Sequence, residues 1–198
     1  MDLLNEKSKS EGKNNKIITF TVPTCYQFIE DEEYSRLLKA CREVDLIYLE
    51  HAFVFSIETT MRQGELLRAK WEHVNFKKRT LFIPDTKTGF LSKDLTSNRT
   101  IPLSSLAIKT LQQLPQHISG KIFPITRDQL NQKWKLAKKK AKIKDYHWHD
   151  NRCTGISWCF EKKNLDVSEV MTISGHKSPT ILLKRYTKLN PTKIAMKI

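Results

Sequence analysis

The stretch LIYLEHAFVFSIETTMRQGELLRAKWEHV, residues 46–74, decides the fold. Its first half, residues 46–60, is apolar nearly all round and lacks the polar face that a surface helix turns toward water. This pattern is typical of a helix buried at the centre of a domain. The second half, MRQGELLRAKWEHV, predicts a shorter helix or a pair of turns where the chain emerges from the core.

Elements of two kinds flank this central helix. On its N-terminal side, residues 31–44 open with acidic residues and place apolar side chains at helical spacing, which predicts an amphipathic helix. On its C-terminal side, residues 80–84 and 99–103 are short β-prone runs separated by a polar loop that contains glycine. These two runs predict a hairpin, the one clear strand signal in the chain.

From Ser104 onward the sequence pattern is helical again. The expected fold class is therefore mostly α with a small antiparallel β-sheet (α+β), in one domain over residues 20–190. Residues 1–19 are polar with almost nothing to bury and are expected to form a tail or linker, and residues 191–198 a C-terminal tail. The helical segments are SSLAIKTLQQL, TRDQLNQKWKLAKKKAKIK, HDNRCTGISWCFEKKN, DVSEVMTISG and SPTILLKRYTKL.

Composition narrows the class of partner. The 198 residues contain 35 Lys and Arg against 21 Asp and Glu, a formal charge of +14, with a pI near 9.7. A polyanion is the expected partner, and nucleic acid is favoured over an anionic membrane surface. No apolar run reaches the length of a membrane-spanning helix and the N-terminus is polar, so the sequence predicts a soluble, cytoplasmic protein.

The cysteines predict packing rather than redox or metal chemistry. None of the four forms a CxxC pair, and a chain of this length can bury a core without disulfides, which predicts reduced thiols. His147 and His149 lie near two of them, but neither the cysteine spacing nor the histidine spacing matches a structural zinc site. The cysteines are Cys25, Cys41, Cys153 and Cys159.

A lysine-rich run, KWKLAKKKAKIK over residues 133–144, is the strongest local concentration of charge. It is either a solvated helix face or a contact with the phosphate backbone of DNA, which would position DNA without reading its sequence. The net charge of the chain favours the DNA contact. The lysines expected to make it are Lys133, Lys135, Lys138, Lys139, Lys140 and Lys142.

Five short segments hold the residue types that phosphoryl transfer without a metal needs. Arg62 follows the central helix, where its guanidinium can direct two donors at a phosphate, and Glu65 can orient it. Lys87, at the start of the hairpin loop, can protonate a leaving oxygen. Each has a plain alternative, because Arg62 and Glu65 could form a surface ion pair of little energetic consequence and Lys87 could be a solvated turn lysine.

The remaining segments lie in the C-terminal half. His149 and Arg152 form an H-x-x-R at a helix start, where i,i+3 spacing puts both on one face and the helix N-terminus favours an anion. His176 follows a Ser-Gly pair between two helices, and Tyr186 lies in a helix with apolar positions. Taken singly, capping or packing explains the histidines, solvation explains Arg152, and a half-buried structural role explains Tyr186.

Taken together and in order, these segments resemble the active-site signature of the tyrosine recombinases, the phage integrase family. TTMRQGELLRAKWEHVNF is similar to the family's first arginine box, PDTKTG followed by RTIPLS to its lysine hairpin, and HDNR with SGHKSPTILLKRY to its second box. The resemblance covers about residues 20–190. Each motif is weak evidence for the family by itself, whereas the same motifs in this order form a specific pattern.

The resemblance implies how the reaction would run. Arg62 and Arg152 would clamp the scissile phosphate, with Glu65 supporting Arg62. Tyr186 would attack the phosphorus and form a 3′-phosphotyrosine, which conserves the energy of the broken phosphodiester so that rejoining needs no ATP. A phenol with a pKa near 10 attacks poorly unless nearby cations stabilise its anion and the growing phosphorane charge.

The same resemblance implies roles for three further residues. Lys87 would protonate the departing 5′ oxygen, His149 would assist proton removal or hold the phosphate, and His176 would add a hydrogen bond. No cofactor is implied, because two arginines and a lysine can supply the charge stabilisation that magnesium supplies in other phosphoryl-transfer enzymes.

The sequence departs from the family pattern at three points. Thr60 stands where a glycine commonly precedes the arginine box by two residues, and Cys153 stands where a histidine often follows Arg152. Ten residues rather than nine lead from His176 to Tyr186. Because one residue rotates a helix by about 100°, the turn after His176 has to absorb the difference.

Partners follow from the resemblance as expectations. Double-stranded DNA would be the substrate, with a homo-oligomer, a tetramer, on DNA and a monomer in isolation, in a phage or mobile element. Residues 191–198 would either dock on a neighbouring subunit or fray. Members of the family usually carry a separate clamp domain before the catalytic one, so weak, salt-dependent DNA binding is expected of this chain.

Two other functions remain open at this point. A type IB topoisomerase-like enzyme would use similar tyrosine chemistry to relax supercoils without exchanging strands. A DNA-binding remnant would keep the basic surface without turnover.

Overall fold

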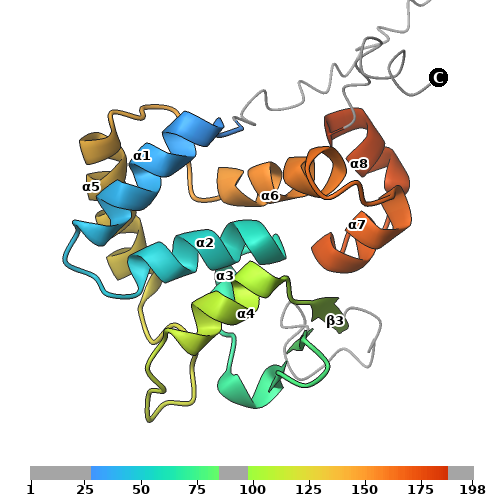
Figure 1. Cartoon of the computed structure of the whole chain (residues 1–198), viewed down its shortest axis with the longest axis horizontal. Helices are drawn as coiled ribbons and strands as arrows, with labels where there is room; N and C mark the ends of the chain where they lie inside the picture. The colour runs from blue at the N-terminus through green and yellow to red at the C-terminus, as the bar shows by residue number, and fades with distance from the viewer. Residues whose placement is uncertain (1–27, 85–97, 187–198) are drawn as a thin grey trace, which may run out of the picture.

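The computed structural model describes residues 28–84 and 98–186, without the side chains of residues 181 and 184–186. Helix α2, Leu49–Thr59, lies at its centre, and Phe53 and Phe55 on it are fully buried. It packs against α6 on one side and α4 on the other (Figure 1). The predicted buried central helix is confirmed, although it begins three residues after Leu46, so that Ile47 is exposed.

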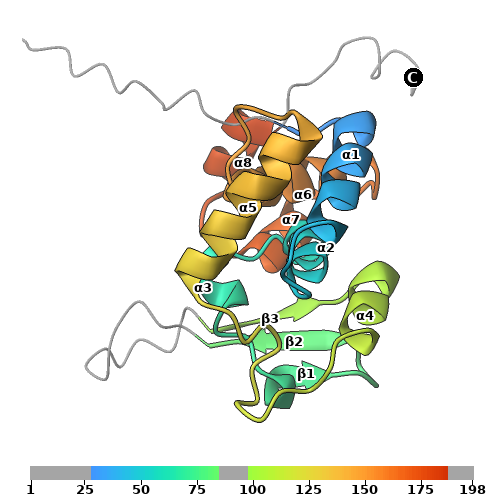
Figure 2. The same cartoon turned by 90° about the vertical axis from the view of Figure 1, so that its left-hand side faces the viewer.

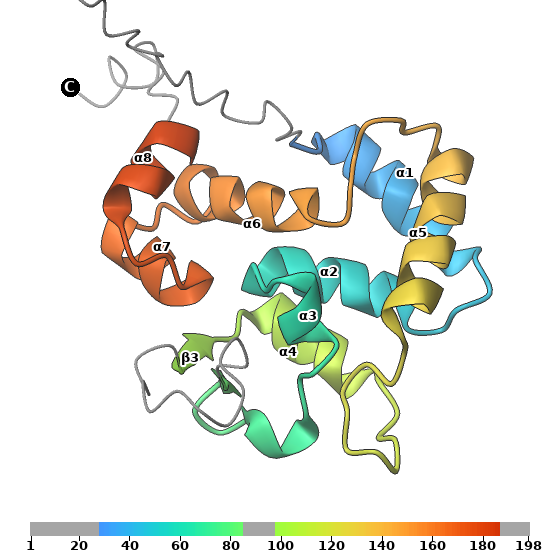
Figure 3. The same ribbon diagram turned by 180° about the vertical axis from the view of Figure 1, so that it is seen from behind.

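Helices α1, Asp31–Arg42, and α5, Arg127–Ala141, pack side by side at one end of the molecule (Figure 3). Acidic residues fill the first turn of α1, where they complement the positive end of the helix dipole. Helix α5 begins with a capping box, in which Thr126 Oγ1 accepts from the Gln129 amide at 3.1 Å and Gln129 Oε1 accepts from the Thr126 amide at 2.9 Å.

A three-stranded antiparallel sheet in the order β1-β2-β3 lies below the central helix (Figure 2). The predicted hairpin is confirmed as β2, Thr80–Ile83, and β3, Arg99–Pro102, paired in a register that sets Ile83 opposite Arg99. Strand β1, Val74–Asn75, was not predicted, because two residues carry no alternation of polarity. The 3-10 turn η1, Trp71–His73, precedes it, and α4, Ser105–Gln112, follows β3.

The C-terminal part of the described chain is a group of three helices with a hydrophobic core of its own. Helix α6, Asp150–Glu161, carries Ile156 into this core, α7, Val167–Ser174, carries Val170, and α8, Pro179–Tyr186, carries Leu182. The predicted fold class, mostly α with a small antiparallel sheet, is confirmed. Within the described residues, no helix has both the length and the apolar character needed to cross a bilayer.

Several expectations fall on residues that the structure does not describe. The proposed tails at residues 1–19 and 191–198, the loop residue Lys87, and Cys25 all lie outside the described ranges. The other three cysteines are buried, and none of them is joined in a disulfide, in agreement with the predicted packing role. They are Cys41, Cys153 and Cys159.

Thr60 is a strained point in the backbone. It follows the last residue of α2 with φ 53° and ψ 20°, in the left-handed region that favours glycine. Its side chain is fully buried against α6, and its hydroxyl has no hydrogen-bond partner among the described residues. The resemblance places a glycine at this position, so the departure in sequence coincides with a conformation that suits glycine.

Substitution Thr60→Gly is expected to raise the free energy of unfolding by about 1 kcal/mol, because it removes a β-branched residue from the left-handed region. It also removes a buried hydroxyl without a partner, which offsets the loss of a buried methyl group. Urea unfolding measures the change.

The matched control is Thr59→Gly. Thr59 is helical and its hydroxyl donates to Phe55 O at 2.5 Å, so this substitution should destabilise the protein. A Thr60→Gly variant less stable than wild type would contradict the assignment of strain.

Candidate active site

Arg62 and Glu65 lie where the chain leaves the central helix. The left-handed turn at Thr60 redirects the backbone, and Arg62 then caps the short helix α3, Gln63–Leu66. Glu65 Oε2 accepts from the Arg62 amide at 2.8 Å, and Glu65 Oε1 accepts from Arg62 Nη1 at 3.0 Å. The Arg62 side chain is 42% exposed and that of Glu65 is 12% exposed, so the carboxylate is enclosed while the guanidinium reaches solvent.

Arg99, the first residue of β3, binds the same carboxylate. Its Nη1 donates to Glu65 Oε1 at 3.0 Å and its Nη2 to Glu65 Oε2 at 2.9 Å, a two-pronged pair. Sequence reasoning included Arg99 only within the word RTIPLS and gave it no role. A basic residue at the first position of a predicted strand, next to the lysine loop, was the signal that could have identified it.

The two arginines set the ionisation of Glu65. Burial by itself would raise the pKa of this carboxyl, but the hydrogen bond and charge of Arg99, followed by those of Arg62, lower the pKa to about 2. Glu65 is therefore an anion throughout the pH range in which proteins work. It neutralises one of the two guanidinium charges and leaves the pair with net positive charge.

Substitution Glu65→Gln is expected to change how stability depends on pH. A carboxyl whose folded pKa lies below its ordinary value of 4.5 stabilises the fold above that value, and this contribution is lost as pH falls from 4.5 toward 2. Thermal melts between neutral pH and pH near 2 should show wild type losing this contribution and Glu65→Gln lacking it. The variant should cost about 3 kcal/mol at neutral pH, because two arginines lose a buried partner.

A surface control separates this effect from general acid unfolding. Glu33 is partly exposed and pairs with Arg36 at 3.8 Å, so Glu33→Gln removes one carboxylate without touching the site. If the stability of Glu65→Gln followed the same pH curve as that of Glu33→Gln, Glu65 would not be held as an ion by its arginines.

Arg152 ties the arginine turn to the helix pair α6–α7. It is 3% exposed, and its Nη1 donates to Thr60 O at 2.6 Å while its Nη2 donates to Ser174 O at 2.8 Å. These bonds fix the guanidinium between the residues that precede Arg62 and those that precede His176.

The two candidate histidines occupy helix boundaries, as their sequence positions suggested. His149 is the exposed N-cap of α6, three residues before Arg152. His176 follows Gly175, which ends α7 with φ 71°, and His176 Nδ1 lies 2.7 Å from Ser174 Oγ. The contact with Ser174 Oγ orients the His176 ring. The carbonyl of the same serine accepts from Arg152.

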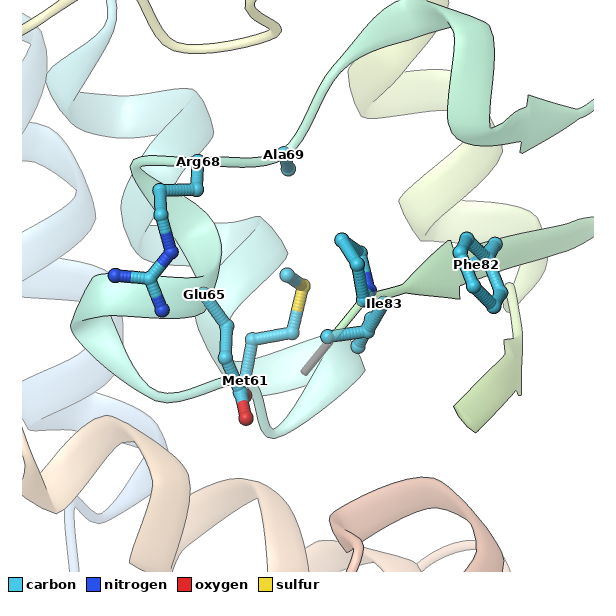
Figure 4. A pocket seen from close by; sticks show the side chains of 7 residues that line it. Met61, Glu65, Arg68, Ala69, Phe82 and Ile83 are labelled. Atoms are coloured by element: carbon cyan, nitrogen blue, oxygen red, sulfur yellow. The ribbon is translucent and has the colours of Figure 1, made fainter. Parts of the chain in front are cut away.

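A small hollow adjoins the acidic side chain of the cluster. Residues of α3, of the chain that follows it and of β2 line it, and Figure 4 shows Glu65 on α3, Arg68 on the chain that follows α3, and Phe82 and Ile83 on β2. Its volume is about 10 Å³, which is space for one water molecule. The lining residues are Met61, Glu65, Arg68, Ala69, Phe82, Ile83 and Pro84.

The structure therefore gathers Arg62, Glu65, Arg152 and His176 at one junction of α3, α6 and α7, with Arg99 added from β3. Lys87 lies outside the described residues. Tyr186 is the last residue of α8, and its side chain also lies outside what is described.

The lysine-rich run is on α5 and its C-terminal end rather than at this junction. Lys133 Nζ lies 4.0 Å from Asp45, and Lys140 Nζ lies 3.1 Å from Glu43, so two of the six predicted lysines face carboxylates. The i, i+4 spacing places two exposed lysines, Lys135 and Lys139, on one face of α5, and a third exposed lysine, Lys142, caps the C-terminal end of the helix. We call these the lysine stripe: Lys135, Lys139 and Lys142.

Comparison with known proteins places this arrangement in a family. The model of the phage integrase family matches residues 27–193. The shufflon-specific DNA recombinase of Escherichia coli is 36% identical over 170 residues, which are 86% of this chain and 42% of that protein. The chain thus spans less than half the length of that relative.

Solved structures share the fold. The catalytic domain of bacteriophage HP1 integrase superposes with a TM-score of 0.65 at 20% identity, over 86% of this chain and 94% of that one. A lambda integrase tetramer bound to a Holliday junction superposes with a TM-score of 0.63 at 18% identity, over 83% of this chain and 50% of that one.

Proposed function

Since the chain belongs to the phage integrase family, we propose that it cuts and rejoins DNA strands as a site-specific recombinase, through a covalent bond between Tyr186 and DNA. The observation that carries this proposal is the junction in which Arg62 and Arg99 bind one carboxylate while Arg152 donates to the carbonyls of Thr60 and Ser174. Such a cluster has net positive charge and can stabilise the charge that builds on a phosphate during displacement.

The proposed reaction has two balanced steps. In cleavage, the Tyr186 oxygen attacks the scissile phosphorus and loses its proton, and the bond from phosphorus to the 5′ oxygen breaks. Lys87 gives a proton to that leaving oxygen, and His149 takes the phenol proton or holds the phosphate. In rejoining, the 5′ hydroxyl of a partner strand attacks the 3′-phosphotyrosine and releases Tyr186, so the number of phosphodiester bonds is conserved.

The remaining residues hold the phosphate in this proposal. Arg62 is the exposed clamp, with its guanidinium set by Glu65 at 3.0 Å. Arg152 would hold the phosphate together with Arg62, and His176 would add one hydrogen bond. Arg152 donates to Thr60 O, two residues before Arg62, which supports a shared phosphate site for the two arginines.

We further propose double-stranded DNA as the partner, with four copies assembled on it and a phage or mobile element as the setting. The net charge of +14 supports a polyanionic partner. The comparison with a lambda integrase tetramer on a Holliday junction supports the assembly.

DNA binding by this chain is expected to be weak and strongly dependent on salt. We expect a dissociation constant of about 1 µM or weaker at physiological salt, and about a 1000-fold loss of affinity between about 50 and 200 mM salt. Lys135→Ala and Lys139→Ala, in the lysine stripe, should each lower the salt slope by about 1. Fluorescence anisotropy with duplex DNA measures both quantities.

Lys109, exposed on α4, provides the matched lysine control, and Lys109→Ala should leave the slope unchanged. Nanomolar, site-specific binding at physiological salt would contradict this expectation. Equal slopes for the stripe and control variants would show that the lysine stripe is only a solvated face.

The function itself is tested with nicked duplexes cut from DNA that flanks the coding sequence, in buffer containing EDTA. A nick next to the cleavage site releases a short strand, which traps the protein on DNA. We expect two results: a covalent adduct that survives denaturation, and the exchange of strands between two duplexes.

The alternatives give other results. An adduct with supercoil relaxation but no exchange would favour a topoisomerase-like enzyme, and DNA binding without an adduct would favour a DNA-binding remnant. Either outcome overturns the recombinase proposal.

A further inference from the structure

Arg99 and Glu65 form the most complete ion pair of the described site. Each Glu65 oxygen accepts one bond from Arg99, at 3.0 and 2.9 Å, and one from Arg62, at 3.0 and 2.8 Å. The carboxylate is thus held on both oxygens from two directions. Without Arg99, Glu65 would keep only its two described bonds with Arg62, the residue that it orients.

Burial distinguishes this pair from a surface ion pair. The Arg99 side chain is 16% exposed and that of Glu65 is 12% exposed. Two-pronged pairs of arginine with carboxylate fix geometry as well as contribute energy, because the planar guanidinium matches both oxygens. A lysine has a single charged centre and cannot hold both oxygens in this way.

Arg99 also contacts the turn that carries His176. A Cβ atom added to Gly175 would lie 2.9 Å from Arg99 Nε and 3.0 Å from Arg99 Cζ, so the guanidinium passes close over the backbone of this glycine. The packing of α7 on β3 agrees with this contact. One side chain therefore touches both the carboxylate that sets Arg62 and the residue that precedes His176.

We propose that Arg99 is a positioning residue, which holds Arg62 through Glu65 and supports the Gly175–His176 turn. Arg62 and His176, two of the proposed phosphate ligands, thereby keep a fixed separation. Arg99 itself touches no reacting atom in this scheme. The part played in catalysis rests on the proposed function, whereas the positioning of Arg62 does not depend on it.

The test of positioning uses the full chain without DNA. Side-chain ¹⁵N NMR resolves arginine Nε–H and Nη–H groups, and Arg62→Lys identifies the Arg62 signals by their loss. We expect slow guanidinium rotation at Arg62 in wild type and rapid rotation in Arg99→Ala and Arg99→Lys.

Arg79 provides the control. It is exposed, precedes β2 and donates to Leu103 O and Ser105 Oγ away from the site, so Arg79→Lys should leave the Arg62 signals unchanged. Unchanged Arg62 signals in Arg99→Ala would overturn the proposal, whether or not the protein cleaves DNA.

A cleavage assay then separates positioning from a general structural defect. At saturating nicked DNA, Arg99→Ala should lower the rate of adduct formation about 100-fold while DNA affinity changes little. In a Glu65→Gln background the same change should lower the rate by a clearly smaller factor, because the action on Arg62 through Glu65 is already lost and only the support of the His176 turn remains to be removed. Equal rate losses in the two backgrounds would overturn action through Glu65. A wild-type chain that forms no adduct at all would instead refute the proposed function, with the NMR result unaffected.

Discussion

Replacement of Tyr186 by phenylalanine is expected to abolish the covalent adduct with nicked DNA completely. The substitution removes one oxygen atom, the proposed nucleophile, and keeps the ring, so the helix α8 that ends at Tyr186 should persist. DNA affinity should stay within about 2-fold of wild type, because the phosphate ligands and the basic surface are unchanged. Denaturing gels of protein incubated with nicked duplex measure the adduct, and anisotropy measures affinity.

Tyr146 is the matched control for this experiment. It precedes the HWHDNR segment, is 1% exposed, and its hydroxyl lies 2.9 Å from Thr154 Oγ1. Burial raises the pKa of the Tyr146 phenol well above its ordinary value, which disfavours the anion that a nucleophile must form. Tyr146→Phe should keep the adduct and lose about 1 kcal/mol of stability with the hydrogen bond. An adduct that disappears in Tyr146→Phe and persists in Tyr186→Phe would reverse the assignment.

Substitution Gly155→Ala is expected to have the largest effect on folding. A Cβ at this position would lie 2.1 Å from the carbonyl oxygen of Ile57 and 3.0 Å from its carbon, so α6 and α2 would have to separate. The obstacle is backbone at the centre of the molecule and cannot move aside as a side chain could. We expect a loss of about 3 kcal/mol or more in the free energy of unfolding.

Gly64→Ala controls for the chemical change itself. An added Cβ there would meet the flexible end of Arg68 at 3.2 Å, and alanine is favoured over glycine in a helix. Gly64→Ala should therefore unfold at nearly the same urea concentration as wild type. Comparable stability of Gly155→Ala and wild type would mean that α2 and α6 do not pack as described.

The central helix and the hairpin could be predicted because burial leaves a direct mark on composition. Residues 49–59 lack a polar face since α1, α4 and α6 cover the helix, and the hairpin runs alternate because one face of the sheet is buried. Strand β1 has two residues and forms only because β2 offers an edge to pair with. Pairing of that kind is a property of the tertiary structure and leaves no pattern in sequence.

The site could be predicted only in part. The order of the candidate residues along the chain, Arg62, His149, Arg152 and His176, indicated a shared junction. In the structure, Arg152 donates to the carbonyls of Thr60, two residues before Arg62, and of Ser174, two residues before His176. Arg99 was missed because a bond between residues 34 positions apart depends on how β3 lies against α3. The lysine run was treated as one surface, whereas acidic residues of other elements pair with two of its members, which no local pattern reveals.

The most direct test of the account is to map the residue that bears DNA in the adduct. The trapped protein is digested with nuclease and protease, and mass spectrometry locates the tyrosine that carries a nucleotide through its phosphate. The account predicts a modified peptide that contains Tyr186 and none that contains Tyr146. A nucleotide on any other residue, from an adduct that forms at the wild-type rate, would contradict the assignment of Tyr186 as the nucleophile.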